Sequence, residues 1–160
     1  MIVRVRRQGA GKAEEKLPPA PGSYLLVLRL PAPERPAIGA LGEQDFAPGT
    51  YLYCGSALGP GGVRARVRRH VEGAPSLHWH IDYLLRRARV QAVWVRTGTR
   101  RLECEWAAAL SRNDAFTCPA PRFGASDCRC RSHLWRCGLN TAGLETAARG
   151  LPLAPRLLWR

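Results

Sequence analysis

Lysine and acidic residues are scarce in this chain of 160 residues. Only Lys12 and Lys16 are lysines, so arginine supplies the other 23 of the 25 cationic side chains, against 12 acidic ones. A GC-rich codon bias would explain arginine in place of lysine, but it does not explain the small number of acidic residues. The formal charge of +13 and the pI near 10.7 therefore indicate polyanionic partners, and planar guanidinium groups suit bidentate contact with phosphate.

Long hydrophobic runs are also missing. The longest apolar stretches, such as residues 24–28, are far too short to span a bilayer, and no apolar run of the signal type follows the arginines at 4, 6 and 7. No amphipathic helix with a broad apolar face predicts attachment to a membrane surface. We therefore expect a cytoplasmic protein without a membrane partner, in which the six cysteines are reduced thiols.

The length and the hydrophobic content of 46% predict one domain with a real core. Residues 1–21 mix charged residues with glycine, alanine and proline, which is typical of an N-terminal arm. Residues 139–160 carry few signals and are interpreted as a C-terminal tail. The expected domain therefore covers residues 22–138.

Hydrophobic periodicity predicts six elements inside this domain. Residues 24–30 and 50–56 have the pattern of buried strands, and 90–95 that of a third strand. Helical spacing of apolar residues predicts helices over 62–72, 78–88 and 102–110. If the first two strands pair antiparallel, residues 22–24 lie beside 53–55. The order predicts an α/β fold, with a small, mainly antiparallel three-stranded sheet flanked by helices.

Several residues could together hydrolyse a phosphodiester bond, which requires an activated water, charge relief on the non-bridging oxygens and assistance to the leaving oxygen. Tyr24 and Tyr53 can orient or deprotonate water, and Arg66 can bind phosphate. Arg66 and His70 are four residues apart and share a helix face. The helix over 102–110 offers a carboxylate for a divalent metal ion.

These residues resemble the GIY-YIG nucleases in order and spacing. The resemblance rests on Gly22-Ser23-Tyr24, Tyr53-Cys54-Gly55-Ser56, Val63-x-x-Arg66-Val67-x-x-His70 and the acidic helix that follows. Two longer signatures look like the small prokaryotic branch known as Uri-superfamily endonucleases. They are His78-Trp79-His80-Ile81-Asp82-Tyr83-Leu84 and Phe123-Gly124-x-Ser126-Asp127-Cys128-x-Cys130-x-Ser132-His133-Leu134.

The resemblance implies an endonuclease that cleaves DNA with Mg²⁺ or Mn²⁺. It makes Tyr24 the base or water-orienting group, Tyr53 its partner in the site and Arg66 the phosphate contact. His70 joins the catalytic candidates on the same helix face. The metal-binding glutamate falls at Glu105 or Glu103, with Glu105 favoured because Glu-Trp-Ala resembles the matching helix of Slx-type nucleases.

The remaining basic surface predicts nucleic-acid contacts at Arg64, Arg68, Arg69 and Ser56. The altered centres of the first two motifs, Ser23 and Cys54, leave open a second hypothesis, a non-catalytic module that binds nucleic acid on the same fold. The sequence does not specify which DNA or RNA structure is bound.

Cys128, Cys130 and His133 form a compact cluster in the sequence. Cys-x-Cys is a tighter spacing than common zinc knuckles use, so we expect this segment to close the domain structurally. Zinc is the alternative, with Asp127 and Cys118 available to complete a tetrahedral set. Asp82 is interpreted as an anion at a helix N-terminus, and His78 and His80 as hydrogen-bonding side chains.

Overall fold

The computed structural model describes residues 16–159, which form an α/β fold built on one antiparallel sheet. In this part of the chain the sheet has six strands in the order β4-β5-β2-β1-β3-β6. The three long strands at its centre are β1 (Gly22–Leu30), β2 (Gly49–Ala57) and β3 (Arg89–Thr97). The shorter strands are β4 (Phe116–Thr117), β5 (Leu134–Cys137) and β6 (Arg156–Trp159).

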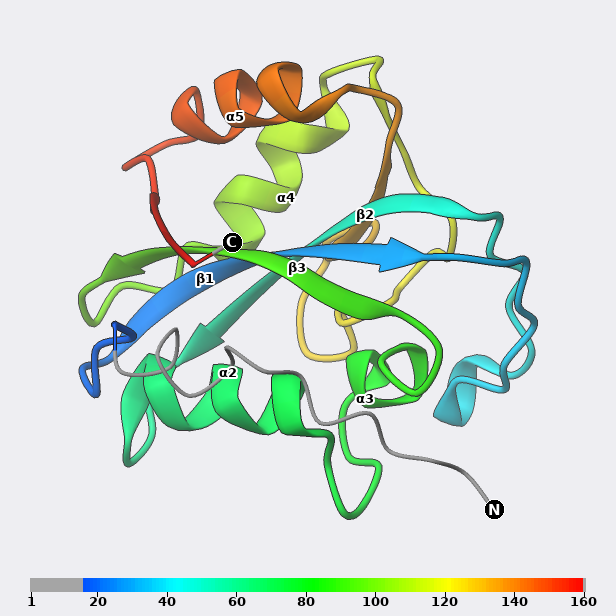
Figure 1. The fold of residues 1–160 in the computed structure, drawn as a ribbon, viewed down its shortest axis with the longest axis horizontal. Helices are drawn as coiled ribbons and strands as arrows, with labels where there is room; N and C mark the ends of the chain where they lie inside the picture. Colours follow the sequence, from blue (N-terminus) through cyan, green and yellow to red (C-terminus); the bar gives the residue numbers. More distant parts are fainter. Residues whose placement is uncertain (1–15, 160) are drawn as a thin grey trace.

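Within residues 16–159, four α-helices cover the two faces of the sheet (Figure 1). Helices α2 (Gly62–Glu72) and α3 (His80–Leu84) lie on one face, and α4 (Glu103–Ser111) and α5 (Thr141–Arg149) on the other. A short 3-10 helix, η1 (Gly39–Leu41), lies in the connection between β1 and β2. The chain thus forms three layers, and each outer layer has its own apolar contact with the sheet.

The central strand β1 is apolar along most of its length because both of its faces are covered. Tyr24, Leu26 and Leu28 point toward the α2 and α3 layer, whereas Leu25 and Val27 belong to the core beneath α4 and α5. This alternation is the two-residue period of a strand. The sequence prediction of a buried strand here is confirmed.

The pairing of β1 with β2 is antiparallel, as the sequence predicts, and aligns Tyr24 with Gly55. The two motifs are therefore neighbours in the sheet although a long connection separates them in the chain. A side chain at Gly55 would have its Cβ 2.5 Å from the Tyr24 ring. Glycine at this position lets the Tyr24 ring cross the neighbouring strand.

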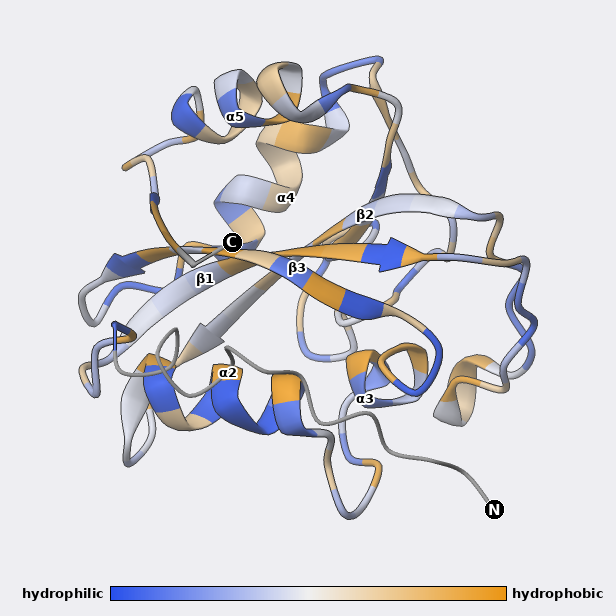
Figure 2. Cartoon of the chain, viewed as in Figure 1, coloured by the Kyte–Doolittle hydropathy of each residue, from blue (hydrophilic) through white to orange (hydrophobic). Residues whose placement is uncertain are grey.

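Helix α2 has a narrow apolar stripe and a basic outer surface, visible in Figure 2 as alternating orange and blue. Val63 and Val67 are buried against the sheet. Gly61 precedes the helix with a positive φ of 78°, and Gly73 ends it with a φ of 88°. Both bounds match the predicted helix over 62–72.

The sheet is larger than the three strands predicted, because β4, β5 and β6 extend it at both edges. These strands have two to four residues, too few to show a periodic pattern. Helix α3 is also shorter than the predicted stretch over 78–88. Its short length leaves His78 and Trp79 in the preceding loop.

The segments at both ends of the domain pack on this sheet where the structure describes them. Residues 139–159 supply α5 and β6, with Leu144 and Ala148 buried. Residues 1–15 of the predicted N-terminal arm lie outside the described residues, but Leu17 is only 1% exposed and its carbonyl accepts a hydrogen bond from Arg64 Nε at 2.7 Å. Among the described helices, none combines the length and the apolarity needed to cross a membrane.

Candidate active site

A cavity of about 400 Å³ opens where α2, the loop before α3, the start of α4 and the loop before β5 meet strands β1 and β2. It collects chemistry-bearing side chains from six segments of the chain. Four of them are Tyr24, Tyr53, Arg66 and Glu103, which the sequence predicts as site residues. Its other polar side chains belong to Ser56, His78, His80, Arg101, Ser126, Asp127 and His133.

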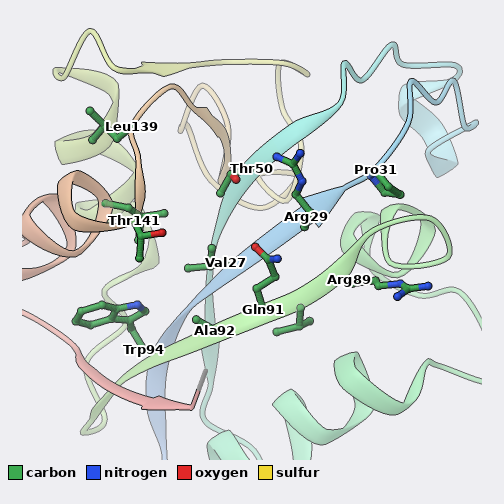
Figure 3. A pocket seen from close by; sticks show the side chains of 12 residues that line it. Val27, Arg29, Pro31, Thr50, Arg89, Gln91, Ala92, Trp94, Leu139 and Thr141 are labelled. Carbon is green, nitrogen blue, oxygen red and sulfur yellow. The ribbon is translucent and has the colours of Figure 1, made fainter. Parts of the chain in front are cut away.

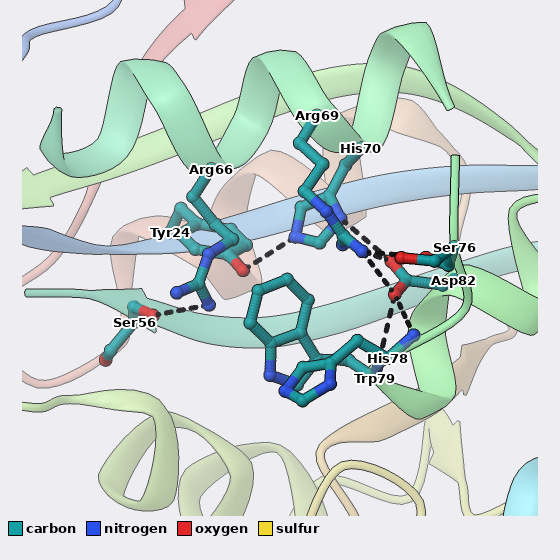
Figure 4. A network of polar contacts seen from close by, with 9 residues as sticks. All are labelled: Tyr24, Ser56, Arg66, Arg69, His70, Ser76, His78, Trp79 and Asp82. Atoms are coloured by element: carbon teal, nitrogen blue, oxygen red, sulfur yellow. Dashed lines mark hydrogen bonds and ion pairs between the residues drawn. The ribbon is translucent and has the colours of Figure 1, made fainter. Parts of the chain in front are cut away.

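Tyr24 is the innermost of these groups and belongs to a chain of buried polar side chains. Its hydroxyl lies 2.9 Å from His70 Nε2, and His70 Nδ1 lies 3.8 Å from Asp82 Oδ1 (Figure 4). All three residues are less than 5% exposed. With the imidazole proton on Nδ1, facing the carboxylate, Nε2 accepts a hydrogen bond from Tyr24.

Burial determines the protonation states of His70 and Tyr24. It lowers the pKa of His70 to about 3, although the Asp82 carboxylate acts in the opposite direction. Burial also raises the pKa of Tyr24, although Arg66 opposes that shift. At neutral pH the pair therefore consists of a neutral imidazole and a protonated phenol.

Arg66 lies on α2 with its half-buried side chain over the cavity. Its Cζ stacks 3.9 Å from the centroid of the Trp79 ring, and its Nη1 donates to the Ser56 carbonyl at 3.4 Å. The indole and the carbonyl fix the plane of the guanidinium group. The remaining N–H groups can then bind an anion that enters the cavity.

Glu103 begins α4 and is 9% exposed. A chain of hydroxyls leads to it: the Leu102 N–H donates to Ser23 Oγ at 2.9 Å, Ser23 Oγ lies 2.7 Å from Ser56 Oγ, and Ser56 Oγ donates to Glu103 Oε2. The serine in the centre of the first motif thus links β1 and β2 to the start of α4. Arg101 Nη1 lies 3.8 Å from Glu103 Oε1 and balances part of its charge.

Glu105, which the sequence favours as the metal ligand, does not line this cavity. Its carboxylate accepts hydrogen bonds from Arg100 at 2.7 and 3.0 Å on the exposed side of α4. Two residues along an α-helix are rotated by roughly 200°, so Glu103 and Glu105 face opposite sides. Of the two glutamates predicted as metal ligands, Glu103 therefore lines the cavity and Glu105 does not.

The residues predicted to contact nucleic acid have different surroundings. Arg64 is exposed, while Arg68 pairs with Glu72 on the surface of α2 at 2.9 Å. Arg69 instead donates to both oxygens of the buried Asp82, at 2.7 and 3.0 Å. Ser56 lies in the cavity as a partner of Glu103. Arg64 and Arg68 thus remain at the surface, and Arg69 holds α2 to α3.

The sequence prediction did not include Trp79, Asp82 or Arg101 in the site. One of the two long signatures could have indicated them, because it places Trp79 and Asp82 next to His78 and His80, which line the cavity. Asp82 accepts hydrogen bonds from the N–H groups of His78 and Trp79, each at 2.9 Å, which confirms its predicted role at the N-terminus of a helix. His80 is a hydrogen-bonding histidine, as predicted, because its Nδ1 accepts from the Gly124 N–H at 2.9 Å.

Beside the cavity, Cys128, Cys130 and His133 are joined by Cys104, the second residue of α4. Their potential ligand atoms all lie within 4.8 Å of one another. The sequence prediction considered Cys118 or Asp127 as a fourth member and missed Cys104. Only the fold brings α4 against the loop before β5.

A larger cavity of about 880 Å³ lies elsewhere, between β1, β3 and the start of α5 (Figure 3). Its lining combines apolar side chains with Arg29, Arg89, Thr50, Gln91 and Thr141. No carboxylate, histidine or cysteine is among the lining residues. The titratable groups thus converge on the smaller cavity.

Comparison with known protein families gives a match over most of the chain. The model of a family described as "Domain of unknown function DUF123" matches residues 23–151. This range includes every residue of the smaller cavity. No curated protein and no solved structure matches the chain.

Proposed function

The chain belongs to the DUF123 family, whose description names no function, and we propose that it is a metal-dependent endonuclease that hydrolyses phosphodiester bonds in DNA. The observation that carries this proposal is the convergence of Tyr24, Tyr53, Arg66 and Glu103 on one cavity. Each group suits a different requirement of phosphodiester hydrolysis. Such a set is not needed for binding alone.

We assign the enzyme to the GIY-YIG type. The antiparallel neighbours β1 and β2 carry the two tyrosine motifs, and α2 carries the arginine. The spacing of Gly22-Ser23-Tyr24 and Tyr53-Cys54-Gly55 agrees with that assignment, as does the acidic start of α4. The close approach of Gly55 to the Tyr24 ring gives a physical reason for glycine at the end of the second motif.

In the proposed reaction Tyr24 receives a proton from the attacking water and passes its own proton to His70. The Tyr24 hydroxyl lies 2.9 Å from a neutral imidazole nitrogen, so the second transfer needs no rearrangement. Asp82, 3.8 Å from the other ring nitrogen, stabilises the imidazolium that forms. The relay avoids a free phenolate, and the Asp82 carboxylate offsets part of the burial effect that lowers the pKa of His70.

Arg66 binds the non-bridging oxygens of the scissile phosphate in this mechanism. Its stacking on Trp79 and its contact with Ser56 orient the guanidinium group before substrate arrives. Tyr53, 7% exposed at the cavity wall, can donate a hydrogen bond to the same phosphate. Charge that develops on the phosphate is then stabilised by donors already in position.

Glu103 fits a divalent metal ion of the Mg²⁺ or Mn²⁺ class. Such ions take hard oxygen ligands, and Mg²⁺ is often held by one or two carboxylates together with water and substrate phosphate. Glu103 offers one carboxylate, with the Ser56 hydroxyl beside it. When bound there, the ion would supply Lewis-acid assistance to the leaving oxygen.

DNA is the proposed substrate class because the chain carries a formal charge of +13 and an arginine-rich α2 beside the cavity. Arg64 and Arg68 are exposed on that helix and can contact the flanking phosphates. Binding through phosphate groups positions a duplex without selecting a base sequence. The backbone geometry of the DNA, as in branched or nicked forms, would then decide where cleavage occurs.

The test is a nicking assay on linear and branched DNA with Mg²⁺, Mn²⁺ or EDTA. Glu103→Gln should reduce cleavage by about two to three orders of magnitude, as loss of a transition-state group does. Glu105→Gln is the matched control on the same helix and should cleave like the wild-type protein. DNA binding should persist in both variants.

Three results would overturn the proposal. Cleavage that persists in EDTA would exclude the metal-dependent mechanism. Wild-type activity in Glu103→Gln would exclude Glu103 as the ligand. DNA binding without cleavage of any substrate, in either metal, would instead favour the non-catalytic binding module.

A further inference from the structure

Three thiols and one imidazole converge next to the cavity, in a position that the proposed hydrolysis does not use. Cys104 comes from α4, Cys128 and Cys130 come from the loop before β5, and His133 ends that loop. Their ligand atoms lie within 4.8 Å of one another. Three cysteines cannot all be satisfied by one disulfide, and all of them are free thiols in the structure.

Two distances in the cluster match the sulfur–nitrogen edge of a metal tetrahedron. Zn–S bonds of about 2.3 Å and a Zn–N bond of about 2.0 Å at tetrahedral angles put sulfur and nitrogen about 3.5 Å apart. His133 Nε2 lies 3.5 Å from Cys128 Sγ and 3.6 Å from Cys104 Sγ. We propose that Cys104, Cys128, Cys130 and His133 bind one structural Zn²⁺ ion.

Zinc fits this donor set better than a harder cation does. Thiolate and imidazole ligands favour Zn²⁺, whereas Mg²⁺ and Mn²⁺ favour oxygen. Four protein ligands also fill a tetrahedral shell and leave no open position for substrate, which is typical of structural zinc. The cluster is therefore distinct from the metal position proposed at Glu103.

The site would connect the start of α4 to the loop before β5. The loop from 118 to 133 contains no helix or strand, and it enters β5 where the Cys54 N–H donates to the His133 carbonyl at 2.9 Å. Cys104 is adjacent to Glu103 on α4. A bound zinc ion would thus hold the start of α4 and the β5 loop against β2, on one side of the cavity.

This interpretation changes the role assigned to Cys128, Cys130 and His133. Ser132 supplies the turn hydrogen bonds expected of a structural closure, accepting from the Leu134 N–H at 3.0 Å. Those bonds order the backbone of the turn but do not satisfy three thiols. The tight Cys-x-Cys spacing is compatible with this site because it supplies only two of the four ligands. The other two are Cys104 on α4 and His133.

The test uses the full chain purified without chelator and measures its metal content by elemental analysis. We expect one zinc ion per chain in the wild-type protein and a large loss of zinc in Cys104→Ser. Cys118→Ser is the matched control, since this thiol is partly buried but lies outside the cluster, and it should retain zinc. Chelation should lower the Tm of the wild-type protein.

A second measurement remains informative if Cys104→Ser does not fold. Replacement of the bound metal by Co²⁺ in the wild-type protein should give the visible absorption of a tetrahedral ion together with a thiolate charge-transfer band. Protein without bound zinc, iron in place of zinc, or an octahedral Co²⁺ spectrum would each overturn the proposal. None of these readouts depends on nuclease activity, so the proposed function can fail while the zinc site stands.

Discussion

At the scale of the residue, the site depends on polar groups that burial holds in one protonation state. His70 and Asp82 are 3% and 4% exposed, and the imidazole is neutral because water is excluded from it. Arg66 has a different environment, since its half-buried side chain stacks on Trp79 and lines the cavity. In the proposed reaction these two residues of α2 therefore differ in role, His70 as the proton acceptor and Arg66 as the phosphate ligand.

The first prediction concerns Arg66. In Arg66→Ala we expect kcat for DNA cleavage to fall by roughly two to three orders of magnitude, because this group stabilises charge that develops in the transition state. Arg68→Ala is the matched control on the same helix, since its side chain pairs with Glu72 at the surface. It should weaken DNA affinity and leave kcat close to that of the wild type. Equal losses of kcat would show that Arg66 is only one cation of the basic surface.

The second prediction is a pH dependence of stability. The pKa of His70 is lowered to about 3 in the folded state and is near 6.5 in the unfolded chain. Between these values the unfolded state binds more protons, so stability falls as pH decreases from 6.5 toward 3. The loss from this residue is at most about 5 kcal/mol, and the lowered pKa values of His80 and His133 act in the same direction.

Urea unfolding across this pH range would measure the effect. His70→Gln keeps an acceptor for Tyr24 but cannot gain a proton, so its stability should change less with pH than that of the wild type. Identical slopes in the two proteins would show that His70 does not control the acid response.

At the scale of the element, α2 and α3 are joined by one ion pair that is largely buried. Arg69 donates to both oxygens of Asp82, whose side chain is 1% exposed and which also accepts from the N–H groups of His78 and Trp79. Burial by itself raises the pKa of the Asp82 carboxyl, but the hydrogen bonds from Arg69 and from the two N–H groups outweigh it, so the pKa is lowered. The same carboxylate faces His70, so the position of α3 and the state of the site are connected.

The third prediction follows from this pair. Asp82→Ala should reduce the free energy of unfolding by about 3–5 kcal/mol, because it leaves Arg69 and two N–H groups without their partner. Glu72→Ala is the control, since it removes the exposed partner of Arg68, and it should cost about 1 kcal/mol or less. Chemical denaturation of both variants measures the difference. Similar costs for the two substitutions would contradict a special role for Asp82.

At the scale of the whole molecule, charge is the dominant feature. The 25 cationic residues outnumber the 12 acidic ones along the entire chain, with no concentration in one terminal tail. Several arginines form ion pairs with carboxylates of the same chain, as Arg69 does with Asp82 and Arg100 with Glu105. The remaining surface nevertheless carries a strongly positive field that attracts polyanions.

The fourth prediction is a steep salt dependence of DNA binding. When arginines bind phosphates, condensed counterions are released, so the logarithm of the binding constant should fall linearly with the logarithm of the salt concentration. Binding should vary little with base sequence. Fluorescence anisotropy over a salt series, with two unrelated duplexes of equal length, measures both properties. A flat salt series, or tight binding to only one duplex, would contradict this electrostatic interpretation.

The sequence by itself determined the central elements, because local periodicity is enough to define them. The continuous apolar run over 24–30 predicts β1 apart from its first two residues, and the spacing of Val63 and Val67 predicts the bounds of α2. The motif order also predicts that Tyr24 and Gly55 are neighbours, since antiparallel pairing fixes which ends of two strands meet. Charge and composition are additive properties, so they too follow from the sequence alone.

Only the tertiary structure decided which residues share a cavity. Glu103 and Glu105 differ by a rotation about the axis of α4, and the side that faces the sheet depends on how that helix packs. Cys104 reaches Cys128 and His133 because α4 lies beside the loop before β5, a contact that no local pattern encodes. The short strands β4, β5 and β6 form for the same reason, since their hydrogen-bond partners are distant in the chain. Long-range packing therefore selects the cavity glutamate and assembles the cysteine cluster.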